Sequence, residues 1–424
     1  MKKVLIAATL MLSSTVVLSK TTVLTADRMI DVEQGKLVNN AVVVINDNMI
    51  SQAGTEDAVN YPADAEVINL GNYTLMPGFM DMHVHLTSDA TKHGYQGLAD
   101  SLPRVTLTGV KHAKATLMAG FTTVRNVGAP GFADVALRDA INDGDIAGPR
   151  MFVSGPSLGV TGGHCDNNLL PYEFHSVSEG VADGPWAVRE AVRRNIKYGA
   201  TVIKFCGTGG VLSKGTKVGV QQYTFEEMQA LVDEAHMRGL TVATHAHGTQ
   251  GIKTAIKAGV DSVEHVSLLD DEGIELALKH GTYFSMDIYV TEYILGQGEA
   301  AGILEESLNK ERIVGKRQRE SFKKAVDAGV KVIFGTDAGV YPHGDNGKQF
   351  ARMVRFGMTP MQAIQAATIE PATLLKQQEK LGSIKAGKMA DIVGVQGNPL
   401  EDISLLENVG LVVKDGYIVK SVAM

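Results

Sequence analysis

Six residues whose side chains suit metal chemistry come at the ends of strand-like runs of the sequence. They are His83, His85, Lys204, His245, His265 and Asp337. The spacing of the first two places both imidazoles on one face of an extended segment, where both can reach one ion. A lone His-x-His pair is a weak signal, but six candidates at five strand ends could hold two divalent ions if one ligand bridges them. The pattern therefore predicts a binuclear metal site.

Lys204 needs a separate explanation, because an ammonium group has no lone pair to offer a metal. A lysine that is partly desolvated between cations has a lowered pKa, so its side chain is more often a neutral amine. Reaction of that amine with dissolved CO2 would give a carbamate whose anionic oxygen could bridge two ions. For an isolated lysine, a salt bridge at the strand end is the more common role. Among these candidate ligands the carbamate is favoured, so the sequence predicts N6-carboxylysine at Lys204.

The candidate ligands belong to a repeated alternation of apolar strand-like runs and helical patterns. Strand candidates are Gly78 to His83, Thr122 to Val127, Met151 to Gly155, Thr201 to Phe205, Leu240 to Thr244, Ser262 to His265, Tyr283 to Ile288 and Val330 to Gly335. Helical patterns follow most of them, among them Phe225 to Arg238, Gly251 to Ala258 and Glu306 to Ala328. This repetition predicts an α/β fold, a (β/α)8 TIM barrel over residues 76–379, with its reactive groups at the carboxyl ends of the strands. A doubly wound open sheet is the alternative.

Short β-branched segments occur near both ends of the chain. They are Thr22 to Leu24, Ala41 to Ile45, Val67 to Leu70, Asp391 to Val395 and Val409 to Val419. Lys414-Asp415-Gly416 is typical of a hairpin turn within the last of these segments. We therefore expect residues 20–75 and 380–424 to pair into a small β-sandwich domain beside the barrel.

The amino terminus has the three regions of a bacterial secretory signal peptide. Met1-Lys2-Lys3 precedes an apolar run from Val4 to Leu18, and Ser19 is the small residue at its end. A buried first strand or a membrane anchor is the alternative, but the run is shorter than the ~20 residues that a spanning helix needs. The sequence predicts a signal peptide at residues 1–19 and a secreted or periplasmic protein with no stable membrane insertion.

The composition is that of a globular protein with room for one large and one small domain, since 44% of the 424 residues are hydrophobic. A formal net charge of −7 and the absence of a basic run argue against nucleic acid as a partner. Cys165 and Cys206 are too few for a disulfide framework, and neither has a Cys-x-x-Cys mate. We expect both to be free thiols.

The order His-x-His, Lys, His, His, Asp on successive strands resembles the amidohydrolase superfamily in its binuclear-zinc, carboxylated-lysine form. The likeness covers almost the whole chain after the expected signal peptide. Within the superfamily the sequence is similar to the Xaa-Pro dipeptidase-like branch, which includes zinc-dependent carboxypeptidases that remove arginine or lysine. The matching segments are Met76 to Met82, Thr161 to Asp166, Ile203 to Cys206, His245 to Gly248, Phe284 to Tyr289, Gly335 to Gly339 and Leu381 to Asp391.

The resemblance implies a hydrolase that releases the C-terminal amino acid, with a preference for Lys or Arg, from dipeptides or N-acyl amino acids. Two Zn²⁺ ions are the implied cofactor, and a homo-oligomer, as large as an octamer, is the implied assembly. The proline-preferring branch tends to have a tyrosine where this chain has His247, which argues against an Xaa-Pro dipeptidase. Ochratoxin-hydrolysing relatives keep an aryl-amide substrate open as another alternative.

Two further hypotheses remain, one for another kind of hydrolase and one for a protein without catalytic activity. The fold and metal site would also serve a cyclic-amide or lactone hydrolase, because neither determines the substrate. A non-catalytic secreted zinc-binding protein would be expected to lack one of the ligands, and this chain has all six.

The expected mechanism begins with the metal ions, which would lower the pKa of a shared water so that the bridging hydroxide attacks the amide. Asp337 is the candidate for passing the water proton to the leaving amine. His164, placed by a Gly-Gly turn, is the candidate for donating to the developing oxyanion.

Substrate contacts are expected from residues just past the strand ends. His247 and Tyr289 are candidates for holding the terminal carboxylate of the substrate. Asp287 could oppose a cationic side chain on the departing residue, or else lie inside the barrel. His112 and His343 are expected to be ordinary surface or helix histidines.

Overall fold

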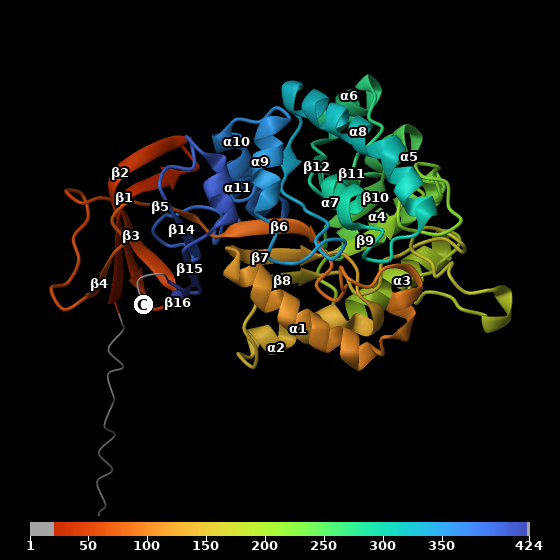
Figure 1. Cartoon of the computed structure of the whole chain (residues 1–424), viewed down its shortest axis with the longest axis horizontal. Helices are drawn as coiled ribbons and strands as arrows, with labels where there is room; N and C mark the ends of the chain where they lie inside the picture. The colour runs from red at the N-terminus through yellow and green to blue at the C-terminus, as the bar shows by residue number, and fades with distance from the viewer. Residues whose placement is uncertain (1–20, 422–424) are drawn as a thin grey trace, which may run out of the picture.

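A computed structural model describes residues 21–421 of the chain (Figure 1). The expected signal peptide at residues 1–19 lies outside the described residues. Among the helices of residues 21–421, none has both the length and the apolar character that a bilayer crossing requires.

Strands from both ends of the chain form one eight-stranded sheet, at the left of Figure 1. They are β1 (Thr21–Asp31), β2 (Lys36–Asn46), β3 (Met49–Thr55), β4 (Glu66–Asn69), β5 (Tyr73–Pro77), β14 (Ile392–Gln396), β15 (Leu411–Lys414) and β16 (Tyr417–Lys420). The order is β16-β15-β14-β5-β1-β2-β3, with β4 paired to β1, and the antiparallel pairing of β5 with β14 joins the two ends. This pairing confirms the expected association of the chain ends. Because the strands form a single sheet, the two-layer sandwich stays a prediction.

All eight strands predicted for the middle of the chain are present. They are β6 (Phe79–Val84), β7 (Phe121–Asn126), β8 (Arg150–Val153), β9 (Ile203–Cys206), β10 (Val242–Ala246), β11 (Ser262–His265), β12 (Tyr283–Ser285) and β13 (Val332–Ile333). They pair in parallel as two sheets, β6-β7-β8 and β13-β12-β11-β10-β9. The α/β class is therefore confirmed.

The two parallel sheets meet at both edges through single parallel bridges. Val84 pairs with Ala338 at one edge, and Leu158 pairs with Phe205 at the other. The described strands thus form neither one doubly wound open sheet nor a continuous closed ladder. Complete closure of the (β/α)8 barrel stays a prediction.

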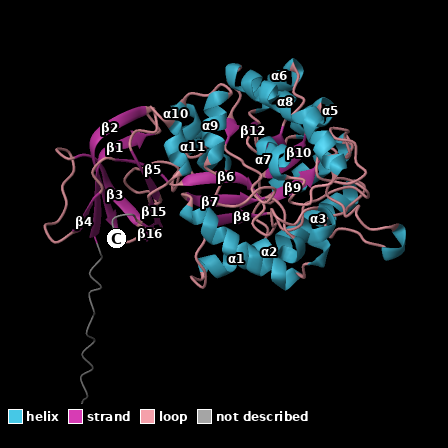
Figure 2. Ribbon diagram, viewed as in Figure 1, coloured by secondary structure: helices cyan, strands magenta, loops and turns pink. Residues whose placement is uncertain are grey.

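Helices surround the parallel strands (Figure 2). They are α1 (Leu102–Met118), α2 (Ala133–Asn142), α3 (Pro185–Lys197), α4 (Phe225–Met237), α5 (Thr249–Ala258), α6 (Asp271–His280), α7 (Val290–Gln297), α8 (Glu305–Asp327), α9 (Lys348–Arg355), α10 (Pro360–Ala366) and α11 (Ile369–Leu374). Short 3-10 helices cover Gly94–Ala99, Pro130–Phe132, Tyr172–Phe174 and Ile403–Glu407. Local signals set the ends of α4 and α5: Thr224 forms a capping box with Glu227, and Gly259 ends α5 with a φ of 95°.

An aromatic cluster links the two parallel sheets inside the molecule. Phe79 and Phe121 come from β6 and β7, Phe334 follows β13, and Phe350 lies on α9. The ring centroid of Phe350 lies 4.9 Å from that of Phe79 and 4.4 Å from that of Phe334. Burying each ring stabilises the fold by about 1.5–3 kcal/mol, so apolar packing holds the sheets together where few backbone hydrogen bonds join them.

Candidate active site

The carboxyl ends of the parallel strands surround a cavity of about 440 Å³. The ligands come from β6, β9, β10 and β11 and from the segments after β6 and β13. All six predicted metal ligands line this cavity: His83, His85, Lys204, His245, His265 and Asp337. The alternating fold thus brings together groups that are far apart in the sequence.

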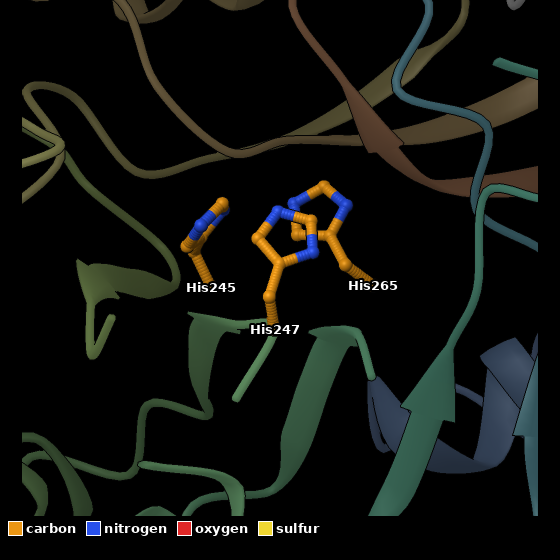
Figure 3. Close-up of side chains that lie close together, drawn as sticks. All are labelled: His245, His247 and His265. Atoms are coloured by element: carbon orange, nitrogen blue, oxygen red, sulfur yellow. The ribbon is translucent and has the colours of Figure 1, made fainter. Parts of the chain in front are cut away.

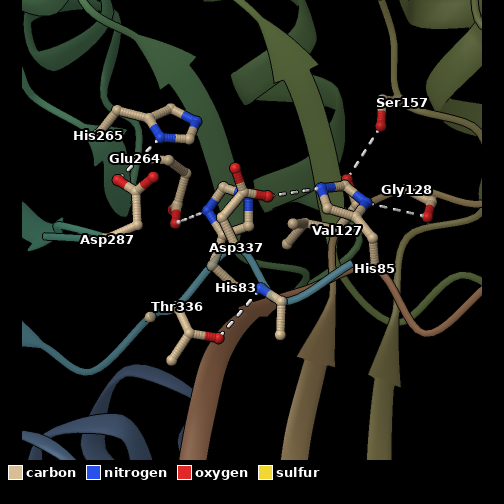
Figure 4. Close-up of polar contacts among 12 residues, drawn as sticks. His83, His85, Val127, Gly128, Ser157, Glu264, His265, Asp287, Thr336 and Asp337 are labelled. Carbon is tan, nitrogen blue, oxygen red and sulfur yellow. Dashed lines mark hydrogen bonds and ion pairs between the residues drawn. The ribbon is translucent and has the colours of Figure 1, made fainter. Parts of the chain in front are cut away.

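Asp337 lies beside the two histidines of the first parallel strand. Its Oδ1 atom is 3.4 Å from His83 Nε2 and 3.5 Å from His85 Nε2. The Nδ1 atoms face the other way, 3.0 Å from Glu264 Oε2 and 3.3 Å from the Gly128 carbonyl oxygen (Figure 4). Burial lowers the pKa of both rings, to about 4 for His85. Both imidazoles are therefore neutral near pH 7, and if Nδ1 donates to these oxygens, each offers a lone pair at Nε2.

A second group of donors lies on the neighbouring strands. The rings of His245, His247 and His265 face one another (Figure 3), and their candidate ligand atoms lie within 4.8 Å of each other. The candidate ligand atoms of His83, His265 and Asp337 also lie within 4.8 Å of each other. Because His265 belongs to both groups, the two groups are adjacent, as a binuclear site requires.

The hydrogen bonds around these rings fit a bound cation. His265 Nδ1 lies 2.9 Å from Asp287 Oδ1, and His247 Nδ1 lies 2.7 Å from Ser267 Oγ. For His265, a predicted ligand, the partner at Nδ1 fixes the ring orientation and leaves Nε2 for a metal, whereas His247 is not among the predicted ligands. His245 Nε2 is buried and has no hydrogen-bond partner among the described residues. An unpartnered buried nitrogen costs about 1–3 kcal/mol, and a cation would remove that cost.

Lys204 on β9 lines the cavity, with 3% of its surface exposed. No hydrogen bond or ion pair joins its Nζ to another residue within 21–421. Burial lowers the pKa of Lys204 to about 8, although Glu264 and Asp337 act in the opposite direction. The neutral amine is therefore accessible near physiological pH, which is the form that reacts with CO2.

Three residues beside the cavity have left-handed backbones that side chains disfavour. The φ angles are 71° at His265, 50° at Val266 and 57° at Asp337. Such conformations cost about 1–3 kcal/mol each in residues other than glycine and are concentrated at functional sites. The surrounding structure therefore holds two of the candidate ligands in strained positions.

His164 comes from the segment between β8 and α3 and covers the second donor group. Its ring centroid is 4.1 Å from that of His245, and its Nδ1 lies 2.8 Å from Ser213 Oγ. Burial lowers the pKa of His164 to about 3, so its ring is neutral.

Known proteins resemble this chain over most of its length. The amidohydrolase family matches residues 74–419. The chain belongs to the amidohydrolase family. Ochratoxinase from Aspergillus niger is 34% identical over 398 residues, covering 88% of this chain and 81% of that protein. A crystal structure of a Xaa-Pro dipeptidase with bound methionine in the active site is 40% identical with a TM-score of 0.89, and the match covers 95% of this chain and 100% of that one. A prolidase complexed with N-methylphosphonate-L-proline is 32% identical with a TM-score of 0.86, over 95% of this chain and 100% of that one.

In this amidohydrolase, the buried carboxylate of Glu264 contacts His83 on β6. We did not predict this contact from the sequence. Glu264 accepts a hydrogen bond from Arg125 Nη2 at 2.8 Å in addition to its contact with His83. Arg125 also donates to the Met82 carbonyl oxygen at 2.6 Å. A signal was present, because Glu264 and Arg125 are charged residues within apolar strands and such residues are rarely buried without a partner.

Asp287 and His247 line the cavity of the amidohydrolase, as the sequence led us to expect of substrate-binding residues. The Asp287 carboxylate is already engaged, however, by His265 Nδ1 and by Gln318 Nε2 at 2.7 Å. Its observed contacts hold His265 in place. His247 keeps its Nε2 for the cavity, since Nδ1 is occupied by Ser267.

The structure does not bring Tyr289 to the cavity. The strand β12 ends at Ser285, and Tyr289 directly precedes α7, where its ring centroid lies 4.9 Å from that of Tyr341. The Arg352 guanidinium covers the same ring at 4.9 Å. The predicted contact of Tyr289 with a substrate carboxylate therefore has no support from its position.

The prediction that Cys165 and Cys206 are free thiols was wrong. The two residues form a disulfide, with Cα atoms 5.9 Å apart and a sequence separation of 41. Cys206 ends β9, and the segment between β8 and α3 returns across the carboxyl end of that strand with Cys165. This pairing could not be predicted from the sequence, because the two segments meet only in the folded chain.

His112 lies on helix α1, as expected, and His343 is half-buried in the segment between β13 and α9. His112 is buried, and burial lowers the pKa of His343 to about 3. The rings stack with centroids 4.7 Å apart, His112 Nδ1 lies 2.9 Å from the Leu86 carbonyl oxygen, and His343 Nε2 lies 3.1 Å from that of His85. They therefore support the backbone of the first ligand pair and do not line the cavity.

Proposed function

We propose that this chain is a metal-dependent amide hydrolase that releases the C-terminal amino acid from dipeptides or N-acyl amino acids, preferring Lys and Arg. The observation that carries the proposal is the convergence of two adjacent donor groups and a buried lysine on one cavity of an amidohydrolase-family chain. A small substrate is supported by one relative with methionine bound in its active site and another complexed with N-methylphosphonate-L-proline.

The proposed cofactor is a pair of Zn²⁺ ions. Its ligands would be His83, His85, His245, His265, Asp337 and carboxylated Lys204. Imidazole nitrogens and carboxylate oxygens are ligands that zinc accepts readily. When bound, such ions lower the pKa of water toward neutrality and polarise a carbonyl group.

The side chains supply proton transfer and orientation. Asp337 Oδ1 lies 3.4 Å from His83 Nε2 and 3.5 Å from His85 Nε2, and this carboxylate is the proposed group that takes a proton from water and returns it to the leaving amine. For His164 Nε2 to donate to the scissile carbonyl oxygen, Nδ1 must accept a hydrogen bond, and the Ser213 hydroxyl is in place to donate it. His247 Nε2 is the proposed donor to the terminal carboxylate of the substrate.

One side of the cavity suits a long cationic side chain. Val290 and Ile294 of α7 and Val314 of α8 provide apolar lining, and Glu311 of α8 places a carboxyl group beside them. The hydrocarbon stem of a lysine or arginine can pack on apolar side chains while its charged end pairs with a carboxylate. Burial raises the pKa of Glu311 to about 7, so this group ionises near neutral pH.

A dipeptide panel tests the preference. We expect kcat/KM to be higher for C-terminal Lys or Arg than for C-terminal Met, and Glu311→Gln to lower the values for Lys and Arg by about 10- to 100-fold, since hydrogen bonds to charged groups contribute about 1.5–3 kcal/mol. Because the carboxyl loses its proton as pH rises through about 7, the preference for Lys should grow between about pH 6 and pH 8 in the parent enzyme only.

The C-terminal Met substrate is the matched control, because Glu311→Gln should leave its kcat/KM unchanged. A parent enzyme that cleaves Met and Lys substrates equally well at every pH would contradict the assigned preference. Activity restricted to C-terminal Pro, or to phenylalanine joined to a bulky aromatic acid, would instead favour the activities named for the prolidase and ochratoxinase relatives.

Removing the metal is expected to abolish amide hydrolysis and lower the melting temperature. Chelation leaves the buried His245 Nε2 without a partner, and a ligand present at about 100 times its Kd adds about 2.7 kcal/mol of stability. We expect a fall of a few degrees in Tm, measured by calorimetry, with Tm and turnover both restored by about two equivalents of Zn²⁺. Unchanged turnover in protein shown by elemental analysis to be metal-free would contradict the proposed cofactor.

We also propose that the mature enzyme works outside the cytoplasm. The Cys165–Cys206 disulfide supports this proposal, because disulfides persist mainly in oxidising compartments such as the periplasm.

A further inference from the structure

The disulfide joins the two segments that carry His164 and Lys204. Cys165 directly follows His164, and Cys206 lies two residues beyond Lys204 at the end of β9. Both cysteines line the cavity. The segment between β8 and α3, residues 154–184, has a single short 3-10 helix, Tyr172–Phe174, and no strand. Regular secondary structure therefore does little to fix the position of His164.

A second segment, residues 207–223 between β9 and α4, forms a cradle around the His164 ring. Ser213 Oγ meets Nδ1 at 2.8 Å, and Gln222 Oε1 accepts a hydrogen bond from the His164 backbone N–H at 3.0 Å. A Cβ atom at Gly210 would lie 2.3 Å from the ring, so the ring packs directly on the backbone there. Lys310 of α8 donates to the Ser213 carbonyl oxygen at 2.6 Å. The cradle is thus attached to a long helix.

From these contacts we infer that Cys165, Cys206 and Ser213 are positioning residues. They hold the His164 ring against His245 of the second donor group. The inference rests on the proposed function, in which His164 donates to the carbonyl oxygen as charge develops. Breaking the disulfide removes the covalent bond next to His164 and leaves only its non-covalent contacts with Ser213, Gln222 and the His245 ring, so the His164 ring samples other positions. Displacement of a catalytic group by about 1 Å can lower a rate by about 100-fold.

Reduction of the purified, metal-loaded protein tests the role of the disulfide. A water-soluble phosphine breaks the Sγ–Sγ bond, takes an oxygen atom from water as phosphine oxide, and leaves two thiols. We expect no reactive thiol in the denatured protein before treatment and two after it. With metal content unchanged, kcat should fall by about 10- to 100-fold while KM changes little, and reoxidation should restore kcat.

The Cys165→Ala/Cys206→Ala variant is the matched control. It should have the lowered kcat from the start and should not respond to the phosphine. Two reactive thiols in untreated protein, a kcat within about twofold of the starting value after full reduction, or equal losses in parent and variant would each overturn the inference.

Ser213 is tested separately by a conservative pair. Ser213→Ala should lower kcat by about 10-fold, whereas Ser213→Thr keeps the hydroxyl and should restore most of it. Equal kcat values for Ser213→Ala and the parent would overturn its assigned role, since a hydroxyl needed only for folding would change Tm and not kcat.

Hydrogen exchange separates failure of this inference from failure of the proposed function. Reduction should speed amide exchange in residues 160–166 while leaving β9 to β11 protected, whatever the substrate is. Oxidised, zinc-loaded protein that cleaves no amide in the panel would refute the proposed function alone. Unchanged exchange in residues 160–166 after complete reduction would refute the inference.

Discussion

Replacing Asp337 by Asn is expected to lower kcat by about 10²–10⁴-fold, the range that general acid–base catalysis contributes. The amide keeps the shape of the side chain but cannot carry the proton from water to the leaving amine. The remaining donors lie on other strands, so the variant should keep at least about one equivalent of metal. The measurements are kcat, KM and metal content at full zinc occupancy.

Asp57→Asn is the control for this variant, because Asp57 is an exposed carboxylate between β3 and β4. Its kcat should equal that of the parent enzyme. An Asp337→Asn protein with kcat within about threefold of the parent, at equal metal content, would refute the assignment of Asp337 as the proton carrier.

Much of this site could be predicted from the sequence because its ligands obey a positional rule. His83, Lys204, His245 and His265 each lie within or at the end of a short apolar strand, and parallel strands direct their carboxyl ends to one side of the molecule. Period and residue type were therefore enough to locate the strands and the side of the fold on which the chemistry occurs.

Contacts between distant segments could not be predicted from the strand patterns. The partners Cys165 and Cys206 are separated by α3, and Ser213 meets His164 only because two irregular segments fold against each other. Local propensity carries no information about such pairs. The direction of the Tyr289 ring was missed for the same reason, since it depends on how α7 follows the short strand β12.

Closure of the eight parallel strands into a barrel shows a similar limit. Each strand is recognisable from its own residues, but the joins at Val84 and Leu158 depend on register between strands that belong to different sheets. Packing of Phe79, Phe334 and Phe350 across the interior gives these joins support that strand patterns do not reveal.

Lys204 gives the prediction that separates a carbamate ligand from a simple counterion. If the buried side chain acts as a cation, Lys204→Arg should keep much of the activity and Lys204→Ala should lose it. If it acts as a carbamate, both variants should lose turnover by at least about 10³-fold and bind no more than about one equivalent of zinc, because neither can supply the bridging oxygens.

Chemical rescue distinguishes the two variants further. Lys204 is buried on β9 and lines the cavity, so truncation to alanine leaves a space that is continuous with the site. A short carboxylic acid such as propionate can enter that space and supply two oxygens, whereas arginine fills it. Propionate should therefore restore turnover and the second equivalent of zinc to Lys204→Ala and not to Lys204→Arg. A Lys204→Arg protein that binds two equivalents of zinc and turns over without added acid would show that the lysine serves as a cation, because a guanidinium group cannot ligate a metal through oxygen.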